Sequence, residues 1–597
     1  MTPRIRGNDY SALTPPRIGS WTPSMRVSVV IPAYNNQAKL DLTLAGLAGQ
    51  TYPAELLEVI VVDNGSDPRL TLPELRPAGT RLIQCDTPGR ANARNAGLAA
   101  STGDVIHWLD SDVVLDRESI EAHMRWHHLA PYLVVTGYLR FSSAELPSPD
   151  VVAGADDLTK LFEPSEPHEW IVDLVERTGG LRQQAHRTFS LHIGGATSVN
   201  ARLLDVAGPM DDKLFLGQDT EMGYRLAQAG AAFIPEPLAR GYHLGPTMRM
   251  RDKEPITRVS HAFIADRIPQ YRWLRSHPGR QWLVPYVELV VDADGASYED
   301  VRATVDAALA GTLPDVGVVI TGPWDTLTPE RRAPLTDPRL DLALIHGHYL
   351  HEGRVRLARE AGPTKAPFRL RVPAGWVPGE DTIARLVDLA VDDGYGLISV
   401  LLAERPVELG RVESALGRTG GTGANVTNGT NNATGTNNAN GANGVESDAG
   451  RGIVSARLER TAAFARAEIA REEDEDVVDV VEDTFGTIWV DGETYGFLPA
   501  ADAPKIRGRR STYRALQDAE AEVARLTKEV ERLKGQVGKW REEAARWRKN
   551  AVEFRREIGA LRKELGALRK SGGFRSAVKR LPLAAYAKRA VTRKPKT

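Results

Sequence analysis

The chain has 597 residues, too many for one compact core, so several domains are expected. Hydrophobic residues make up 42% and charged residues 26%, as in ordinary globular proteins, and a formal net charge of -2 argues against a dedicated nucleic-acid-binding protein. Cys85 is the only cysteine, which excludes an internal disulfide. The sequence has no apolar signal segment and no run of about 18 apolar residues. We therefore expect a cytoplasmic protein.

Residues 1–25 contain several prolines and no periodicity, and they are predicted to be a flexible leader. From Arg26 onwards, strand and helix patterns alternate, and the strands are nearly continuous apolar runs. This pattern indicates an α/β fold with a parallel or mixed sheet covered on both faces. Ligands of such sheets bind at the carboxyl ends of the strands. Because Asp63, Asp110 and Asp112 follow these runs, we expect them at that edge.

Asp110 and Asp112 form a D-x-D pair directly after an apolar run. Carboxylate oxygens suit Mg²⁺ or Mn²⁺, and such an ion can neutralise a leaving diphosphate. A second D-x-D, at 292–294, is interpreted as an ordinary turn. His243 is interpreted as a third metal ligand only beside the acid pair, because a lone histidine is more often structural.

Other polar residues have both a functional and a structural interpretation. Asp63 can accept hydrogen bonds from a base or ribose, or it can simply close a turn. Arg90 and Arg94, near a predicted helix start, can face phosphates or base, or be solvated. Asp219 enters a predicted amphipathic helix and can act as a general base, or as a first-turn acid favoured by the helix dipole.

Taken in order, these segments resemble the inverting family 2 glycosyltransferases with the GT-A fold. The matching stretches, within roughly residues 26–250, are VSVVIPAYNN, QTYP, EVIVVDNGS, RANARNAGLAASTGDVIHWLDSD, GGATSVNARLLDVAGPMDD, GQDTEMGYRL and HLG. The ordered set is specific, although no single motif is. The resemblance implies a GT-A domain at 26–275 that transfers a sugar from a nucleotide-diphosphate donor to a glycan or lipid-linked hydroxyl, with inversion and with Mn²⁺ or Mg²⁺. The processive signature Q-x-x-R-W is absent, so we expect single-sugar transfer.

The resemblance also implies a role for each matching position. Asp219 would be the catalytic base, with Glu221 as the fallback, and Gly194 and Gly195 would line the acceptor side. The metal would be held by Asp110, Asp112 and His243. The nucleotide and donor would be bound by Pro32, Tyr34, Asn35, Asp63, Arg90, Arg94 and Asp110. Two positions depart from the family pattern: Asn64 replaces a second acid, and Gln218 replaces the glutamate before the base.

A second α/β segment, at 283–500, repeats the order of strand, loop, helix, strand and Gly-containing turn. Its alignment with the first places Pro373 opposite Asp110 and Gly375 opposite Asp112, and neither replacement can bind a cation through its side chain. We infer a degenerate GT-A-like copy, with an unrelated α/β domain as the alternative. An insert at 417–450, rich in Asn and Gly, is predicted to be disordered.

The span 513–570 shows apolar residues at alternating steps of three and four, which predicts a coiled coil and hence a homo-oligomer. A single solvated helix would leave this stripe wet. The alternation of Val and Leu favours parallel dimers, and the large residues further on leave a trimer as the alternative. The seam residues are Leu516, Ala519, Val523, Leu526, Val530, Leu533, Val537, Trp540, Ala544, Trp547, Ala551, Phe554, Ile558, Leu561, Leu565 and Leu568.

The last segment, 571–597, contains eight basic residues and no acid. We expect it to hold the protein at the inner face of an anionic membrane, near a lipid-linked acceptor, with a merely solvated tail as the alternative.

Two other functions fit the sequence less well. A nucleotidyltransferase would normally carry a Gly-rich phosphate loop where this chain has PAYNNQ. A non-catalytic coiled-coil scaffold would not need the acids and His243. The sequence therefore favours a glycosyltransferase of cell-envelope polysaccharide synthesis.

Overall fold

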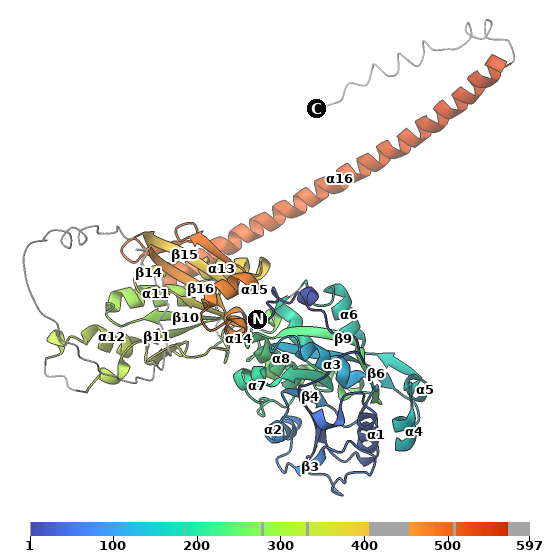
Figure 1. The fold of residues 1–597 in the computed structure, drawn as a ribbon. Coiled ribbons are helices and arrows are strands. Elements are labelled where there is room, and N and C mark those ends of the chain that lie inside the picture. Colours follow the sequence, from blue (N-terminus) through green and yellow to red (C-terminus); the bar gives the residue numbers. More distant parts are fainter. Residues whose placement is uncertain are drawn as a thin grey trace, which may run out of the picture. The chain divides into compact units, whose positions relative to one another are not determined.

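The structure is a computed structural model, and it describes residues 2–183, 185–275, 280–329, 333–404, 453–504 and 509–570. The chain divides into two compact parts, Met1–Ala503 and Pro504–Thr597. The first part contains two large sheets, and the second contains one long helix, α16 (Arg509–Lys570) (Figure 1). The predicted insert and the basic tail lie outside the described residues. None of the described helices has the length and apolar character needed to cross a membrane.

The first sheet has, among the described residues, nine strands in the order β3-β2-β1-β4-β8-β6-β9-β5, with β7 paired to β6. Strands β3, β2, β1 and β4 are parallel, and β8 runs antiparallel to β4 and β6, so the sheet is mixed. Its strands are β1 (Val27–Ala33), β2 (Leu57–Asp63), β3 (Thr80–Gln84), β4 (Val105–Leu109), β5 (Val113–Leu115), β6 (Leu133–Ser142), β7 (Ser165–Pro167), β8 (Ala196–Asn200) and β9 (Ala232–Leu244). The helices are α1 (Gln37–Ala48), α2 (Arg90–Ala100), α3 (Ser119–His127), α4 (Pro149–Gly154), α5 (Thr159–Phe162), α6 (Glu169–Arg177), α7 (Ala201–Ala207), α8 (Gln218–Gln228), α9 (Met248–Arg251) and α10 (Lys253–Ile264).

Both faces of the parallel strands are buried because their apolar side chains alternate between two clusters. On one face Val29 packs in a cluster with Leu44 of α1. On the other face Val30 packs in a cluster with Ala93 of α2. This arrangement confirms the α/β fold class and leaves the carboxyl edge of β1, β2 and β4 for the loops that follow each strand.

The leader differs from the expectation of a flexible segment. Ile5 is only 1% exposed and belongs to the main core cluster. The Asn8 side chain donates to the backbone oxygen of Phe233 at 2.9 Å and accepts from its amide at 2.7 Å. Arg4 pairs with Glu475 and Asp483. These partners lie far away in sequence, so local periodicity carries no sign of the packing.

The second sheet follows the order β12-β11-β10-β13-β16-β15-β17 in the described residues, and β14 and β18 form a separate pair. Residues 405–452 connect β15 to β16. The strands are β10 (Val287–Asp292), β11 (Val316–Thr321), β12 (Val355–Ala358), β13 (Phe368–Arg371), β14 (Trp376–Pro378), β15 (Leu397–Glu404), β16 (Ile453–Arg460), β17 (Thr487–Asp491) and β18 (Phe497–Pro499). The helices are α11 (Tyr298–Ala310), α12 (Leu340–Tyr349), α13 (Thr382–Asp392), α14 (Thr461–Ala470) and α15 (Val477–Thr484). Single turns of 3-10 helix are η1 (Tyr10–Ala12), η2 (Ala54–Leu56), η4 (Arg272–Leu274), η5 (Trp324–Thr326) and η6 (Pro334–Thr336), with the longer η3 (Ala185–Leu191).

The second sheet repeats the topology of the first. The order β12-β11-β10-β13-β16-β15-β17 matches β3-β2-β1-β4-β8-β6-β9, and each matched pair has the same parallel or antiparallel sense. The β14–β18 pair likewise matches β5–β9. When the pairing registers are superimposed, Asp110, Asp112 and His243 fall on Pro373, Gly375 and Pro499. The second sheet therefore lacks, at these three described positions, every side chain that would bind a cation.

Helix α14 packs into the hydrophobic core of the first sheet, although the second sheet also has a buried cluster of its own. Ala463 and Ala467 of α14 belong to the same buried cluster as Leu226 of α8. Arg466 donates to the backbone oxygens of Gly230 at 2.8 Å and Ala231 at 2.9 Å. A β-carbon on Gly230 would lie 2.5 Å from the backbone nitrogen of Arg466, so the close approach of α14 to this turn requires glycine. The segment 283–500 is thus joined tightly to the first sheet.

Three histidines are buried beneath the first sheet around Ser198. His123 Nδ1 and His127 Nε2 lie 2.8 and 2.7 Å from the Ser198 hydroxyl. The His107 ring stands perpendicular to that of His123, with 4.6 Å between centroids. Burial lowers the pKa of His107 and His127 to about 3, and burial together with the neighbouring histidines lowers that of His123. All three rings are neutral in the folded protein at pH 7.

We predict that this cluster makes the fold sensitive to acid. In the unfolded chain histidines take up protons near pH 6.5, whereas these three do not in the folded state, so the unfolded state is favoured as the pH falls from 6.5 towards 3. Each histidine then removes about 1 kcal/mol of unfolding free energy per pH unit. Replacement of His107 by leucine should reduce this slope by one such contribution, measured by urea unfolding at pH 7, 6 and 5. An unchanged slope would show that the cluster does not control acid stability.

Candidate active site

A cavity of 870 Å³ opens at the carboxyl edge of the parallel strands. Strands β1, β2 and β4 end at the same edge, so the loops that follow them meet there. The sequence-predicted residues in its wall are Pro32, Tyr34, Arg90, Asp110, Asp112, Asp219 and His243. The structure therefore brings together side chains from five separate stretches of the chain.

Asp110, Asp112 and His243 form a compact group in this wall. Asp110 and Asp112 lie in the turn between β4 and β5, and His243 of β9 pairs with Val113 of β5. One ligand atom of each residue lies within 4.8 Å of the others. His243 Nδ1 lies 2.8 Å from the Gly245 oxygen, to which it must donate, so Nε2, 3.5 Å from Asp112, is the ring atom that a metal would use. Two carboxylates and an imidazole so oriented fit a divalent cation.

Lys39 of α1 adds a positive charge beside this group. Its ammonium lies 3.6 Å from Asp112 Oδ2 and donates to the Leu244 oxygen at 2.6 Å. No sequence signal marks this residue, because Lys39 resembles any polar residue of an amphipathic helix. Only the packing of α1 against the end of β9 brings it to the acid pair.

Arg94 of α2 joins Asp110 to Asp219. Its guanidinium donates to Asp219 Oδ1 at 2.6 Å, to Asp110 Oδ1 at 2.9 Å and to the Gly194 oxygen at 2.9 Å. The Arg94 side chain is 1% exposed, whereas the two carboxylates are about 30% exposed. Arg94 thus lies beneath the cavity floor and fixes one oxygen of each acid, which leaves the other oxygen of each to the cavity.

The charges of this floor reinforce one another. Burial raises the pKa of Asp110, but the positive charges of Arg94 and Arg90 outweigh it, so the pKa lies below its ordinary value. In turn, the negative charges of Asp110, Asp219 and Asp112 raise the pKa of Arg90. Asp110 is therefore ionised at neutral pH, as a metal ligand requires.

Gly194 and Gly195 lie against the same ion pair. A β-carbon on Gly194 would lie 2.0 Å from Arg94 Nη2, and one on Gly195 would lie 3.0 Å from Asp110 Oδ2. Neither residue is in the cavity wall defined by the described residues. These glycines make room for Arg94 and Asp110, which is their evident structural role.

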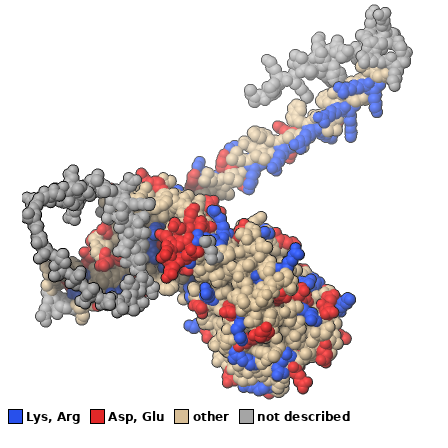
Figure 2. Space-filling view, in the orientation of Figure 1, with Lys and Arg blue, Asp and Glu red and all other residues tan. Residues whose placement is uncertain are grey.

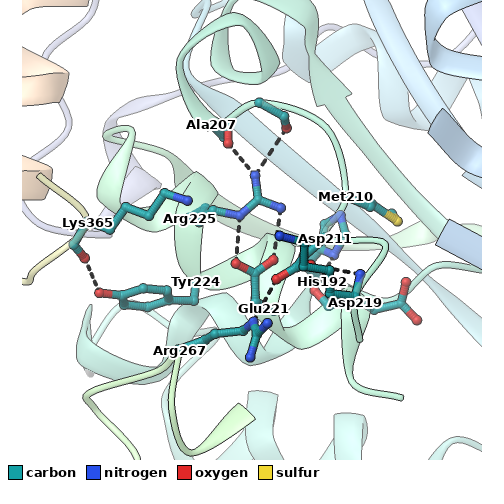
Figure 3. Close-up of polar contacts among 12 residues, drawn as sticks. His192, Ala207, Met210, Asp211, Asp219, Glu221, Tyr224, Arg225, Arg267 and Lys365 are labelled. Atoms are coloured by element: carbon teal, nitrogen blue, oxygen red, sulfur yellow. Dashed lines mark hydrogen bonds and ion pairs between the residues drawn. The ribbon is translucent and has the colours of Figure 1, made fainter. Parts of the chain in front are cut away.

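Asp219 and Glu221 leave helix α8 in different directions (Figure 3), and of the two only Asp219 lines the cavity. Glu221 forms a buried ion pair with Arg225, at 2.7 and 2.8 Å. Arg225 also donates to the backbone oxygens of Ala207 and Gly208. The Tyr224 hydroxyl donates to the Lys365 oxygen of the second sheet region. The structure therefore does not bring the fallback base Glu221 to the other candidate residues.

Asp63 does not reach the cavity wall either. Its carboxylate is fully buried and accepts from the backbone amides of Ser66 at 2.9 Å and Leu70 at 3.3 Å. Asn35 does not line the cavity either, and its backbone amide donates to the Ser66 hydroxyl at 2.9 Å. Asn64 lines the cavity instead, and its side chain ties the loop at 85–89 to β2. An amide both donates and accepts, so asparagine suits this bridge better than the acid usual in the family.

Comparison with known proteins agrees with this geometry. Residues 28–152 match the model of the family "Glycosyl transferase family 2". The pre-mycofactocin glycosyltransferase of Mycobacterium tuberculosis is 29% identical over 225 residues, which cover 37% of this chain and 43% of that protein. The hyaluronan synthase of Pasteurella multocida is 27% identical over 331 residues, or 50% of this chain and 33% of that protein. The chain thus spans less than half the length of these relatives.

Among solved structures, a mannosyltransferase of Pyrobaculum calidifontis in complex with GDP-Man and Mn²⁺ aligns at 19% identity with a TM-score of 0.27. The alignment covers 43% of this chain and 66% of that one, too loosely to bear on the site. The family match spans β1 to β6 and includes Asp110 and Asp112, which are the residues that the cavity brings together. Residues 28–152, from β1 to β6 of the first sheet, therefore resemble the family 2 glycosyltransferases.

Proposed function

We propose that the chain transfers a single sugar from a nucleotide-diphosphate donor to an acceptor hydroxyl, with inversion and with a divalent cation. The observation that carries the proposal is the convergence of Asp110, Asp112, His243 and Asp219 on one cavity of 870 Å³. A cation held by the first three would neutralise the leaving diphosphate. Asp219 would take the proton of the acceptor hydroxyl, with its orientation set by Arg94.

The remaining residues of the wall suit a nucleotide. Arg90, Arg249 and Arg251 are exposed cationic side chains that line the cavity and can contact phosphates. Tyr34 is 62% exposed and offers an aromatic face to a base. A scaffold without activity would not need such a wall, and the nucleotidyltransferase alternative still lacks its Gly-rich phosphate loop in the segment after β1.

A donor panel tests this function. The full chain should be heated with UDP-, GDP- and dTDP-sugars, each with and without Mn²⁺. One donor class should stabilise the protein, by about 2.7 kcal/mol at a concentration 100 times its Kd, and only when Mn²⁺ is present. If every donor leaves the melting temperature unchanged with Mn²⁺, the chain does not bind nucleotide-sugars at this cavity.

We further propose that α16 pairs with a second copy to form a parallel coiled coil. Its seam side chains are exposed in the single chain: Val523 by 62%, Trp540 by 72% and Trp547 by 71%. With Val523 and Leu526 at heptad positions a and d, acids recur at g and bases at e. The acids are Glu522, Glu529, Glu543, Glu557 and Glu564, and the bases are Lys534, Arg541, Arg548, Arg555 and Arg562. Basic side chains accordingly follow one line along α16 in Figure 2.

These charges favour a parallel arrangement. In a parallel dimer, position g of one helix faces position e of the next heptad of the other, which pairs Glu529 with Lys534, Glu543 with Arg548 and Glu557 with Arg562. An antiparallel dimer would place like charges opposite one another. Within the single helix, the ion pairs Glu522–Arg525, Glu529–Arg532 and Glu531–Lys534 are exposed and contribute little.

A charge exchange should expose this pairing. One variant carries Lys534→Glu, Arg541→Glu and Arg548→Glu, and the other carries Glu529→Lys, Gln536→Lys and Glu543→Lys. Each variant alone should be monomeric, because like charges would then face each other at positions g and e of its homodimer. An equimolar mixture should form the heterodimer, measured as mass by light scattering beside the wild-type chain. A wild-type monomer would contradict the proposal, and a threefold mass would select the trimer.

The acceptor that we propose is a glycan of the cell envelope or a lipid-linked glycan. The support is the basic segment 571–597 in the sequence, which lies outside the described residues. Each Lys or Arg near an anionic surface contributes about 1 kcal/mol of binding. Two copies joined through α16 would present two such segments and bind more tightly than one.

A further inference from the structure

We propose that His192 is a positioning residue for the base Asp219 and acts through the backbone of α8 rather than through the carboxylate. The proposal rests on the function proposed above, in which Asp219 accepts the proton. It assigns to His192 the task of fixing the first turn of α8, so that the Asp219 side chain leaves the helix at a constant place.

The contact is a hydrogen bond to a backbone oxygen. His192 Nδ1 lies 2.8 Å from the Asp219 carbonyl oxygen (Figure 3). A carbonyl only accepts, so Nδ1 carries the proton and donates. Burial, together with the charges of Arg94 and Arg225, lowers the pKa of His192 to about 4, although the charge of Asp219 and the hydrogen bond to it act in the opposite direction. The ring therefore stays neutral at pH 7, with its single proton on Nδ1.

The other ring nitrogen of His192, Nε2, makes no comparable contact in the described part of the chain. His192 is 1% exposed, and its Nε2 has no hydrogen-bond partner among the described residues. A buried nitrogen without a partner costs stability, so an apolar residue of similar size would serve packing alone at least as well. The bond made by Nδ1 is the feature that distinguishes histidine at this position.

Helix α8 is shaped to receive this ring. Gly223 lies one turn after Asp219, and a β-carbon there would lie 2.8 Å from the His192 β-carbon and 2.3 Å from the Phe189 oxygen. Glycine at this position lets the segment that carries His192 lie directly along the first turn of the helix. Together, His192 holds the backbone of Asp219 and Arg94 holds its side chain.

The test uses two amide isosteres in the full chain. The amide nitrogen of asparagine matches the place of Nδ1, whereas that of glutamine matches the place of Nε2. We expect His192→Asn to keep kcat within about threefold of wild type and His192→Gln to lower it about tenfold or more. Glutamine cannot replace the hydrogen bond made by Nδ1, so the Asp219 carboxylate would no longer lie in the correct position for proton transfer. The KM for the donor should stay the same in both variants. Melting temperatures give the folded fraction, to which each rate is referred.

Two results would overturn the inference: equal loss of kcat in both variants, or no loss in either. Asp219→Asn, measured alongside, separates this outcome from failure of the proposed function. If Asp219→Asn remains active, the base assignment fails and the role of His192 fails with it. If Asp219→Asn is inactive while the two isosteres behave alike, only the role of His192 is refuted.

Discussion

Asp219→Asn should lower kcat about 1,000-fold while leaving donor binding within a few-fold of wild type. Asparagine has the same shape as aspartate but cannot take up a proton at neutral pH. Asp219 lines the cavity, and Arg94 holds only one of its two oxygens, so the other is free to meet the acceptor hydroxyl. The measurement is single-turnover transfer at saturating donor, with donor affinity taken from thermal shift.

Glu221→Gln is the matched control, since Glu221 lies two residues further along the same helix. Its carboxylate is buried against Arg225 and turned from the cavity, so the change should act on stability. Loss of the charge leaves Arg225 without its counter-ion and should lower the unfolding free energy by about 3 kcal/mol. The transfer rate per folded molecule should hardly change. If Glu221→Gln folds but does not transfer while Asp219→Asn stays active, Glu221 and not Asp219 is the catalytic base.

Asp112→Ala should abolish Mn²⁺ binding and lower transfer about 1,000-fold, a loss of about 4 kcal/mol of transition-state stabilisation. Asp112 lies between His243 and Lys39, at 3.5 and 3.6 Å, so its removal leaves the remaining ligands beside an uncompensated ammonium. Wild-type protein should bind one Mn²⁺ per chain, measured by the loss of the free-ion signal in electron paramagnetic resonance. Chelator should abolish transfer, and added Mn²⁺ should restore it.

Asp292→Ala is the control for the metal experiment, because Asp292 belongs to a D-x-D of the second α/β segment. Its carboxylate accepts from the Asp294 amide at 3.2 Å and the Thr321 hydroxyl at 3.0 Å, as expected for a turn. The change should leave Mn²⁺ binding intact. A stoichiometry of two ions, or binding that survives Asp112→Ala, would mean that the second sheet holds a cation despite Pro373, Gly375 and Pro499.

The amino-acid pattern alone determined the elements and their order. Buried parallel strands need apolar runs, and the residue after such a run lies at the carboxyl edge, so Asp110 and Asp112 could be assigned to that edge without coordinates. The alternating steps of three and four likewise predicted the long helix, found as α16. Alignment of the two α/β segments likewise placed Pro373 opposite Asp110 and Gly375 opposite Asp112, in agreement with the pairing registers.

The tertiary structure alone decided which side chains meet and which way they face. Arg94 and Asp219 are 125 residues apart, and their ion pair exists only because α2 and α8 flank the same strand end. The phase of helix α8 places Glu221 in a buried ion pair with Arg225, and the carboxylate of Asp63 accepts a hydrogen bond from the turn that follows β2. The segment at 2–25 contributes the buried residues Ile5 and Asn8, and Asn8 is bonded to Phe233. Periodicity records burial along one element, whereas these contacts depend on how distant elements pack, and no local pattern encodes that.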